Sequence, residues 1–301
     1  MLFFCYSISM HGIIIANQEI GHNEYKIKRF KEEFIKLGMT LDLVLNDGTL
    51  AAIENNEIKI NLPVCDFIIY LDKDIYLARL LEKSGYRLFN KADFIKLCDD
   101  KVLTFIACAN KGIRMPKTYA GPLIYTELKE ENYKFLKTIE EDLGFPMIVK
   151  KVYGSLGEGV YLVNNSDELR KLYGEIYRNP ILFQEYIPSS RGKSLRIMVI
   201  DQQVIGGFVR YNHVDFRSNF GETADGRTLP NPEKYFSFAE DIAKKLEIEY
   251  AGIDLLIGDD EEPILCEINS NAFFEEFEKV TKINVAEKVA LLIKKKMGGA
   301  K

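Results

Sequence analysis

The feature that most constrains this chain is the segment AGIDLLIGDDEEPILCEIN, residues 251–269, in which two apolar runs flank an acidic turn. This pattern predicts a β-hairpin. A turn centred on the middle of GDDEEP places Asp254 directly opposite Glu267, and strand alternation puts Asn269 on the same face as Glu267. Directly opposed like charges are destabilising, so this face requires a cation.

All three side chains offer oxygen, which is the ligand that Mg²⁺ and Mn²⁺ prefer. We therefore expect Asp254, Glu267 and Asn269 to hold one or two such ions. The alternative is a pair of half-exposed carboxylates on an edge hairpin. A change of register by one residue would separate the three side chains.

A glycine-rich loop, GSLGEG at residues 154–159, lies between two expected strands and includes Gly157. Small residues let backbone N–H groups approach phosphate oxygens. No GK[ST] follows, and the loop leads into a strand, so it is neither a P-loop nor a Rossmann turn. Lys150 ends the preceding apolar strand and Lys101 lies early in a helix, where each can reach a phosphate. A plain hairpin loop and two solvated lysines are the alternatives.

Polar residues also follow the next strands. The segment FQEYIP, residues 183–188, ends at a proline and could offer free backbone groups to an adenine and a carboxylate to a ribose. Taken alone, the segment favours the alternative, which is a strand end with a solvated Glu. Arg196 and Arg210 border two apolar strands, and DFRSN, residues 215–219, lies in a polar loop. Guanidinium groups beside a metal suit the clamping of carboxylate or phosphate, whereas surface ion pairing is the alternative. Glycines at residues 206–207 predict a bulge, which leaves the shared faces of the two arginines open.

Composition excludes several other classes. The 301 residues are 47% hydrophobic and 28% charged, enough for a sizeable core, and the net charge of −5 argues against a nucleic-acid binder. Five scattered cysteines without a CxxC pair indicate free thiols in a reducing cytoplasm. Apolar stretches are too short to cross a membrane. The apolar start lacks a basic region, so we expect no signal peptide.

Hydrophobic periodicity predicts an α+β chain with no internal repeat. Four short strands and one helix in the first third indicate a small parallel α/β domain, and antiparallel sheets are expected afterwards. The expected strands of that domain are 12–16, 41–45, 57–63 and 67–70, and the expected helices of the chain are 23–37, 100–110, 132–143, 167–177, 233–246 and 285–297.

Taken in order, these motifs resemble the ATP-grasp superfamily and, in detail, the ribosomal-protein-S6 glutamate ligase (RimK-like) branch. The resemblance runs from about residue 90 to the C-terminus and is most specific in QEYI, LRIMVI, DFRSN, AGIDLL and CEIN. It implies that two α+β subdomains grip ATP behind a small pre-ATP-grasp domain. The expected boundaries are 1–97 for the pre-ATP-grasp domain, 98–187 for the first ATP-grasp subdomain and 188–301 for the second.

The resemblance also implies roles for particular residues. It assigns Lys101, Lys150 and Gly157 to the ATP phosphates; Glu185, Tyr186 and Ile187 to adenine and ribose; Arg217, Ser218 and Asn219 to a nucleotide-contacting loop; Asp254, Glu267 and Asn269 to Mg²⁺; and Arg196 and Arg210 to the reacting acyl phosphate.

The implied activity is an ATP-dependent carboxylate–amine ligase that forms an amide bond through an acyl phosphate. Its substrates would be a small-molecule or peptide carboxylate and an amino acid, for which the resemblance implies glutamate. The chain departs from the family at Ser194, where an Asp is usual, and at residues 270–273, where a Ser-Pro-Gly turn is usual. A small-molecule kinase and a non-catalytic nucleotide-binding module are the alternatives, and self-association into a homo-oligomer stays open.

Overall fold

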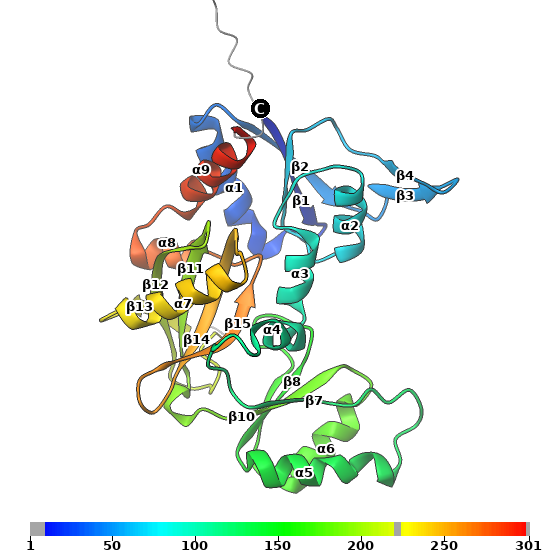
Figure 1. Ribbon diagram of the computed structural model, residues 1–301, viewed down its shortest axis with the longest axis vertical. Helices are drawn as coiled ribbons and strands as arrows, with labels where there is room; N and C mark the ends of the chain where they lie inside the picture. The colour runs from blue at the N-terminus through cyan, green and yellow to red at the C-terminus, as the bar shows by residue number, and fades with distance from the viewer. Residues whose placement is uncertain (1–9, 220–223, 299–301) are drawn as a thin grey trace, which may run out of the picture.

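The N-terminal third of the computed structural model forms a parallel sheet between two layers of helices (Figure 1). Its elements, with the C-terminal helix that joins them, are β1 (His11–Asn17), α1 (Glu24–Lys36), β2 (Thr40–Asn46), β5 (Phe67–Tyr70), α2 (Ile75–Lys83), β6 (Leu88–Phe89), α3 (Ala92–Asp99) and α9 (Val285–Gly298). The strand order is β2-β1-β5-β6. Alternate side chains of β1 enter different cores: Ile14 packs with α1 and α9, and Ile13 packs with α2 and α3.

The structure describes residues 10–219 and 224–298. Cys5 and the start of the chain, where no signal peptide is expected, therefore lie outside the described residues. Within those ranges, no helix is both long and apolar enough to cross a membrane.

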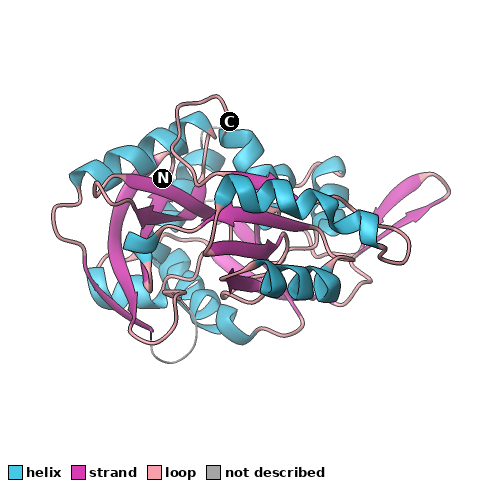
Figure 2. Ribbon diagram, turned by 90° about the horizontal axis from the view of Figure 1, so that it is seen from below, coloured by secondary structure: helices cyan, strands magenta, loops and turns pink. Residues whose placement is uncertain are grey.

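One expected strand lies outside the parallel sheet. Residues 57–63 supply β4 (Glu57–Ile60), which pairs only with β3 (Ala51–Glu54) in a separate antiparallel hairpin. Figures 1 and 2 both show this hairpin standing clear of the body. Both strands are too short and too polar to be buried in the centre of a sheet.

The second sheet is antiparallel and is covered on one face by two helices. Its order is β7-β10-β8-β9, and α5 and α6 bury Leu136, Leu169 and Tyr173 against it. These elements are α4 (Lys101–Cys108), which enters the lobe, β7 (Thr118–Ala120), α5 (Lys134–Leu143), β8 (Met147–Lys151), β9 (Val160–Val163), α6 (Ser166–Ile176) and β10 (Ile181–Glu185).

The third sheet has the order β13-β12-β11-β14-β15. Its elements are β11 (Lys193–Ile200), β12 (Gln203–Asn212), β13 (Ala224–Thr228), α7 (Glu233–Lys245), β14 (Tyr250–Ile257), β15 (Pro263–Asn269) and α8 (Glu275–Thr281). Odd-numbered residues of β11 pack beneath α7, whereas Met198 and Ile200 enter the core shared with α1 and α9. Ser194 and Arg196 alternate onto this second face but lie nearer the second sheet, which leaves a polar end there.

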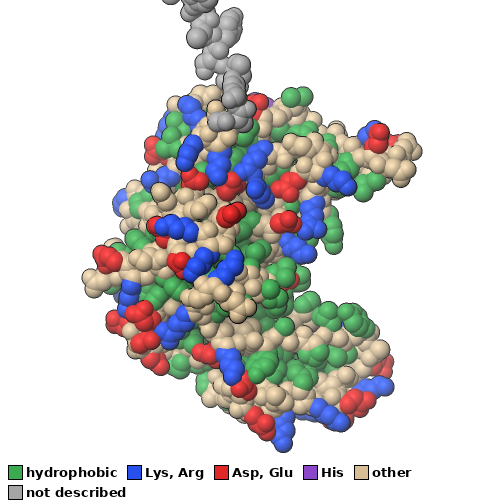
Figure 3. Space-filling view, in the orientation of Figure 1, with side chains coloured by type: hydrophobic (Ala, Val, Ile, Leu, Met, Phe, Trp, Pro, Cys, Tyr) green, Lys and Arg blue, Asp and Glu red, His purple; other side chains and the backbone are tan. Residues whose placement is uncertain are grey.

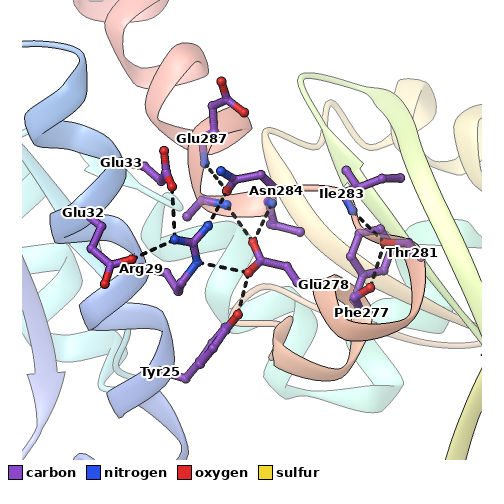
Figure 4. Close-up of polar contacts among 12 residues, drawn as sticks. Tyr25, Arg29, Glu32, Glu33, Phe277, Glu278, Thr281, Ile283, Asn284 and Glu287 are labelled. Carbon is purple, nitrogen blue, oxygen red and sulfur yellow. Dashed lines mark hydrogen bonds and ion pairs between the residues drawn. The ribbon is translucent and has the colours of Figure 1, made fainter.

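A half-buried carboxylate joins the first and third parts of the chain (Figure 4). Glu278 of α8 accepts hydrogen bonds from the Tyr25 hydroxyl at 2.6 Å, from Arg29 Nε at 3.1 Å and from the backbone N–H of Val285 at 2.7 Å. Arg29 also donates to Asn284 Oδ1 at 2.9 Å. Helix α1 is thereby fixed beside the third sheet.

The predicted α+β class is confirmed. Each expected helix is found within three residues of its predicted ends. Helices α2, α3 and α8 and strands β3, β6, β7 and β13 are not predicted from the sequence. Strand β13 lies in a segment that the sequence pattern predicts to be a polar loop. These elements are short or polar, so their periodicity is weak.

Candidate active site

A pocket with about 880 Å³ of empty space lies between the second and third sheets. Figure 3 shows the hollow between the lobe of α5 and α6 and the rest of the molecule. Eleven of the fourteen predicted site residues line this pocket: Lys101, Lys150, Gly157, Glu185, Tyr186, Ile187, Arg217, Ser218, Asn219, Asp254 and Glu267. The other three, Arg196, Arg210 and Asn269, line a second pocket that shares Glu267 and Asn219 with the first.

Two buried lysines face the first pocket, and each has only neutral oxygen partners among the described residues. Lys150 Nζ donates to Gln184 Oε1 at 2.7 Å. Lys101 Nζ donates to the carbonyls of Val152 and Gly154 at 3.2 and 2.9 Å, and burial lowers its pKa. Each lysine is 9% exposed. Two ammonium groups buried without a carboxylate form a site for an anion of more than one charge.

The glycine loop is held over the pocket by the following polar loop. Gly157 has a φ of +78°, which side chains rarely adopt. Arg217 NH1 donates to the Gly157 carbonyl at 2.9 Å, while Arg217 Nε and NH2 hold both oxygens of Asp215 at 2.9 and 2.8 Å. Arg217 therefore ties the two loops together.

The hinge segment and Ser218 also lie at this pocket. The Glu185 carboxylate accepts the backbone N–H of Lys117 at 2.9 Å. The buried hydroxyl of Tyr186 has no hydrogen-bond partner among the described residues. Ser194, the position where the family usually has an Asp, lies with its Oγ 2.5 Å from that of Ser218. Ser194 thus contributes a hydroxyl pair instead of a carboxylate.

Asp254, Glu267 and Asn269 meet on one face of the β14–β15 hairpin. The amide of Asn269 donates to Glu267 Oε1 at 3.0 Å and to Asp254 Oδ2 at 3.3 Å. This donor set fits a hard divalent cation: two carboxylates and an amide that presents its oxygen after a flip.

The predicted pairing of Asp254 with Glu267 is correct, but the symmetric turn from which it was derived is wrong. Ile257 pairs with Pro263, so the turn is centred on Asp260. A bulge beyond Leu255 and Leu265 then adds one residue to β15 and restores the expected pair.

Two arginines, one on β11 and one on β12, approach the Asp254 carboxylate. Arg196, its direct partner on β11, donates from Nε at 2.5 Å and from NH2 at 2.8 Å. Arg210 NH1 lies 3.5 Å from Asp254 Oδ1, and Arg210 Nε lies 3.5 Å from Glu276. Burial opposes the ionisation of Asp254, but both guanidinium charges outweigh it and hold its pKa below the usual value.

The register also settles which faces the arginines share. Arg196 pairs with Phe208 and Ser194 pairs with Arg210, so both arginines lie on one face. The predicted bulge is present, between Met198 and Val199. It lies beyond both arginines and leaves their shared face unchanged.

Sequence patterns missed several residues of this site. Gln184, which holds Lys150, belongs to the QEYI motif, and its place there is the signal that could have identified it. Phe273 and Asn271 line the second pocket from the segment that departs from the family. Lys26 of α1 donates to the backbone carbonyl of Asn271 at 3.2 Å.

Comparison with known proteins agrees with this geometry. Residues 98–293 match the RimK-like ATP-grasp domain. The chain belongs to the RimK-like ATP-grasp family. The predicted resemblance is therefore confirmed.

Relatives of this family member are found among curated proteins and solved structures. An uncharacterised protein of Mycoplasma pneumoniae is 32% identical over 82% of this chain and 87% of its own length. Human N-acetylaspartylglutamate synthase A is 34% identical over 73% of this chain, and the match spans 55% of that enzyme. The ATP complex of D-alanine–D-alanine ligase from Bacillus anthracis has a TM-score of 0.73 at 16% identity, covering 96% of this chain and 98% of that one.

Proposed function

We propose that this RimK-like protein is an ATP-dependent ligase that joins a carboxylate to an amine with release of ADP and phosphate. The observation that carries the proposal is the position of Lys101 and Lys150. Both are buried cations without a carboxylate partner among the described residues, and both line the pocket that Asp254 and Glu267 also line. Two cations that can hold a triphosphate on one side, and an oxygen cluster that can hold a metal on the other, suit phosphoryl transfer.

In the first step, an oxygen of the substrate carboxylate attacks the γ-phosphorus of ATP, and the bond to the β-phosphate oxygen breaks. The products are an acyl phosphate and ADP. Lys101 and Lys150 hold the phosphates, and the glycine loop covers them. Mg²⁺, held by Asp254, Glu267 and Asn269, would neutralise charge on the phosphate oxygens.

In the second step, the substrate amine attacks the acyl carbon, the phosphate leaves with the bonding electron pair, and the proton lost by the amine goes to the departing phosphate. The oxyanion that forms during this attack needs hydrogen-bond donors. Arg210 is 8% exposed, and its two ion-pair contacts are both at 3.5 Å, which is long for a hydrogen bond. Its N–H groups can therefore turn towards a substrate oxygen.

The likeness to N-acetylaspartylglutamate synthase suggests glutamate as the amine and an acidic acceptor as the carboxylate. The acceptor is the less constrained of the two, because residues 270–273 of the second pocket differ from the family pattern.

The experiment is an assay of ADP release with N-acetyl-L-aspartate, citrate or succinate as the acid and L-glutamate as the amine. A ligase gives ADP only when both substrates are present, and the product mass corresponds to condensation with loss of water. A product that keeps the phosphoryl group without any amine would instead establish a kinase. ATP binding without ADP release would establish a binding module.

A further inference from the structure

Lys26 is a fully buried cation in the parallel-sheet part of the chain, outside the ATP-grasp match. It lies on the buried stripe of α1 and is 1% exposed. Its Nζ donates to the backbone carbonyl and to the side-chain oxygen of Asn271, and it lies 4.7 Å from the centroid of the Phe273 ring. Within residues 10–219 and 224–298, no carboxylate lies within ion-pair distance of it. All its partners are therefore neutral.

Such a burial is costly. An ammonium loses most of its hydration in a protein interior, and an apolar side chain would fill the same place without that cost. Burial lowers the pKa of Lys26, and the nearby charge of Arg196 lowers it further. Two neutral oxygens compensate only part of the loss. A charge kept at this cost suggests a role other than stabilising the fold.

The position of Lys26 beside a pocket indicates what that role is. A pocket with about 1240 Å³ of empty space, which we call the vestibule, lies between the first turn of α1 and residues 273–276, and Lys26 lines it. The vestibule shares Arg210, Phe273 and Glu276 with the second pocket, where Glu267 and Asn269 lie. A substrate that reaches the site of phosphoryl transfer through the vestibule passes Lys26.

The other charges around the vestibule are exposed to solvent or lie beside a carboxylate. Glu24 and Lys28 are exposed. Lys279 holds Glu275 at 2.7 Å, and Arg210 lies 3.5 Å from Glu276. Deeper in, Arg196 neutralises Asp254. A substrate anion can therefore form an ion pair with the buried ammonium group of Lys26.

We propose that Lys26 binds a substrate carboxylate that does not take part in the reaction. This inference rests on the proposed function and sharpens its substrate class: one of the two substrates carries an additional carboxylate. It belongs either to the acid, which is then at least a diacid, or to the incoming amino acid. Phe273, whose ring lies against Nζ, lines both the vestibule and the second pocket.

The decisive variant is Lys26→Gln, which removes the charge but keeps an N–H donor for the oxygens of Asn271. Lys26→Arg keeps the charge and should retain part of the affinity. Lys31→Gln is the matched control, because Lys31 is an exposed lysine on the same helix and does not line the vestibule. Melting temperatures identify any variant that fails to fold.

Binding is measured by calorimetry on protein loaded with Mg²⁺ and a non-hydrolysable ATP analogue, titrated separately with citrate, N-acetyl-L-aspartate and L-glutamate. We expect Lys26→Gln to weaken one of these ligands by about 10- to 100-fold, as for a lost charge-assisted hydrogen bond. Affinity for the ATP analogue should not change. If the substitution lowers the affinity for an acid only, the additional carboxylate belongs to the acid. If it lowers the affinity for glutamate only, the carboxylate belongs to the amine substrate.

Equal affinities in parent and Lys26→Gln, including no measurable binding in both, would overturn the inference. The proposed function fails differently: Lys26-dependent binding without ADP release from any acid and amine would overturn the ligase assignment and leave the anion anchor intact. In an active enzyme, the same substitution should raise KM for one substrate with kcat nearly unchanged, whereas a purely structural lysine would not separate the two constants.

Discussion

Arg196 on β11 and Asp254 on β14 are direct cross-strand partners, and the guanidinium donates to both oxygens of the carboxylate at 2.5 and 2.8 Å. One arginine therefore holds in place a carboxylate of the proposed metal-ligand set. Arg210, 3.5 Å from the same carboxylate, is not. The two arginines of the site should consequently behave differently when replaced.

For Arg210, the informative change is Arg210→Lys. Lysine keeps the charge but loses the forked donors, so kcat should fall by about 100-fold, the scale of a lost oxyanion donor, while the affinity for ATP stays within about twofold. Steady-state kinetics and ATP titration check this. Arg227→Lys, at an exposed arginine on β13, is the control. Parallel losses of kcat and ATP affinity would argue against a role at the acyl group.

Glu267→Gln tests the oxygen cluster. The amide keeps the shape but weakens coordination of a divalent cation, so Mg²⁺-dependent turnover should fall by at least about 100-fold with little change in melting temperature. Glu261→Gln in the exposed turn is the control. Parent-like activity of Glu267→Gln across a Mg²⁺ titration would remove Glu267 from the metal site.

Lys150→Ala tests the phosphate site. Loss of a charge-assisted contact should weaken ATP binding by about 1.5–3 kcal/mol, measured by calorimetry. Lys171→Ala, on the exposed face of α6, should bind ATP as the parent does. Unchanged ATP affinity in Lys150→Ala would contradict the assignment.

The hydrogen bonds that join Glu278 to α1 predict that the stability of the fold depends on pH in the alkaline range. Burial and the hydrogen bond to Glu278 raise the pKa of Tyr25 to about 12. The folded state therefore favours the protonated hydroxyl, so this stabilisation is complete below the unfolded pKa of about 10 and is lost as the pH rises through 12. The stability advantage of the parent over Tyr25→Phe should shrink between pH 10 and 12.

Melting temperatures across that range provide the measurement. Tyr125→Phe, at a tyrosine that is 88% exposed, is the control for general alkaline destabilisation. An advantage that stays constant up to pH 12 would show that the Tyr25 hydroxyl does not support the joint.

The β14–β15 hairpin shows how much of the candidate site can be predicted from the sequence. Apolar alternation and an acidic turn predict two strands, and like charges on one face predict a cation site. The turn is centred on Asp260 and not between Asp260 and Glu261, and the bulge near Leu265 compensates for this difference. Neither follows from patterning, because bulges depend on how the strand packs against its neighbours.

Sequence patterns do not predict that α1 contributes Lys26 to the neighbourhood of the site, and this is the larger omission. Its stripe is visible in the sequence, and Lys26 lies on it four residues before the buried Phe30. A lysine at a buried helical position is a usable signal. Its partner Asn271 is 245 residues away, however, and only the docking of α1 beside α8 brings them together. Local hydrophobic periodicity does not predict such contacts between segments that are distant in the sequence.

The central claim is that an acyl phosphate forms on the substrate acid. The most direct measurement is a single turnover with ATP, L-glutamate and an acid labelled with ¹⁸O in its carboxylates. Attack of carboxylate oxygen on the γ-phosphorus transfers one labelled oxygen to the released phosphate, so the account predicts phosphate that carries a single ¹⁸O. Unlabelled phosphate released together with ADP would contradict it.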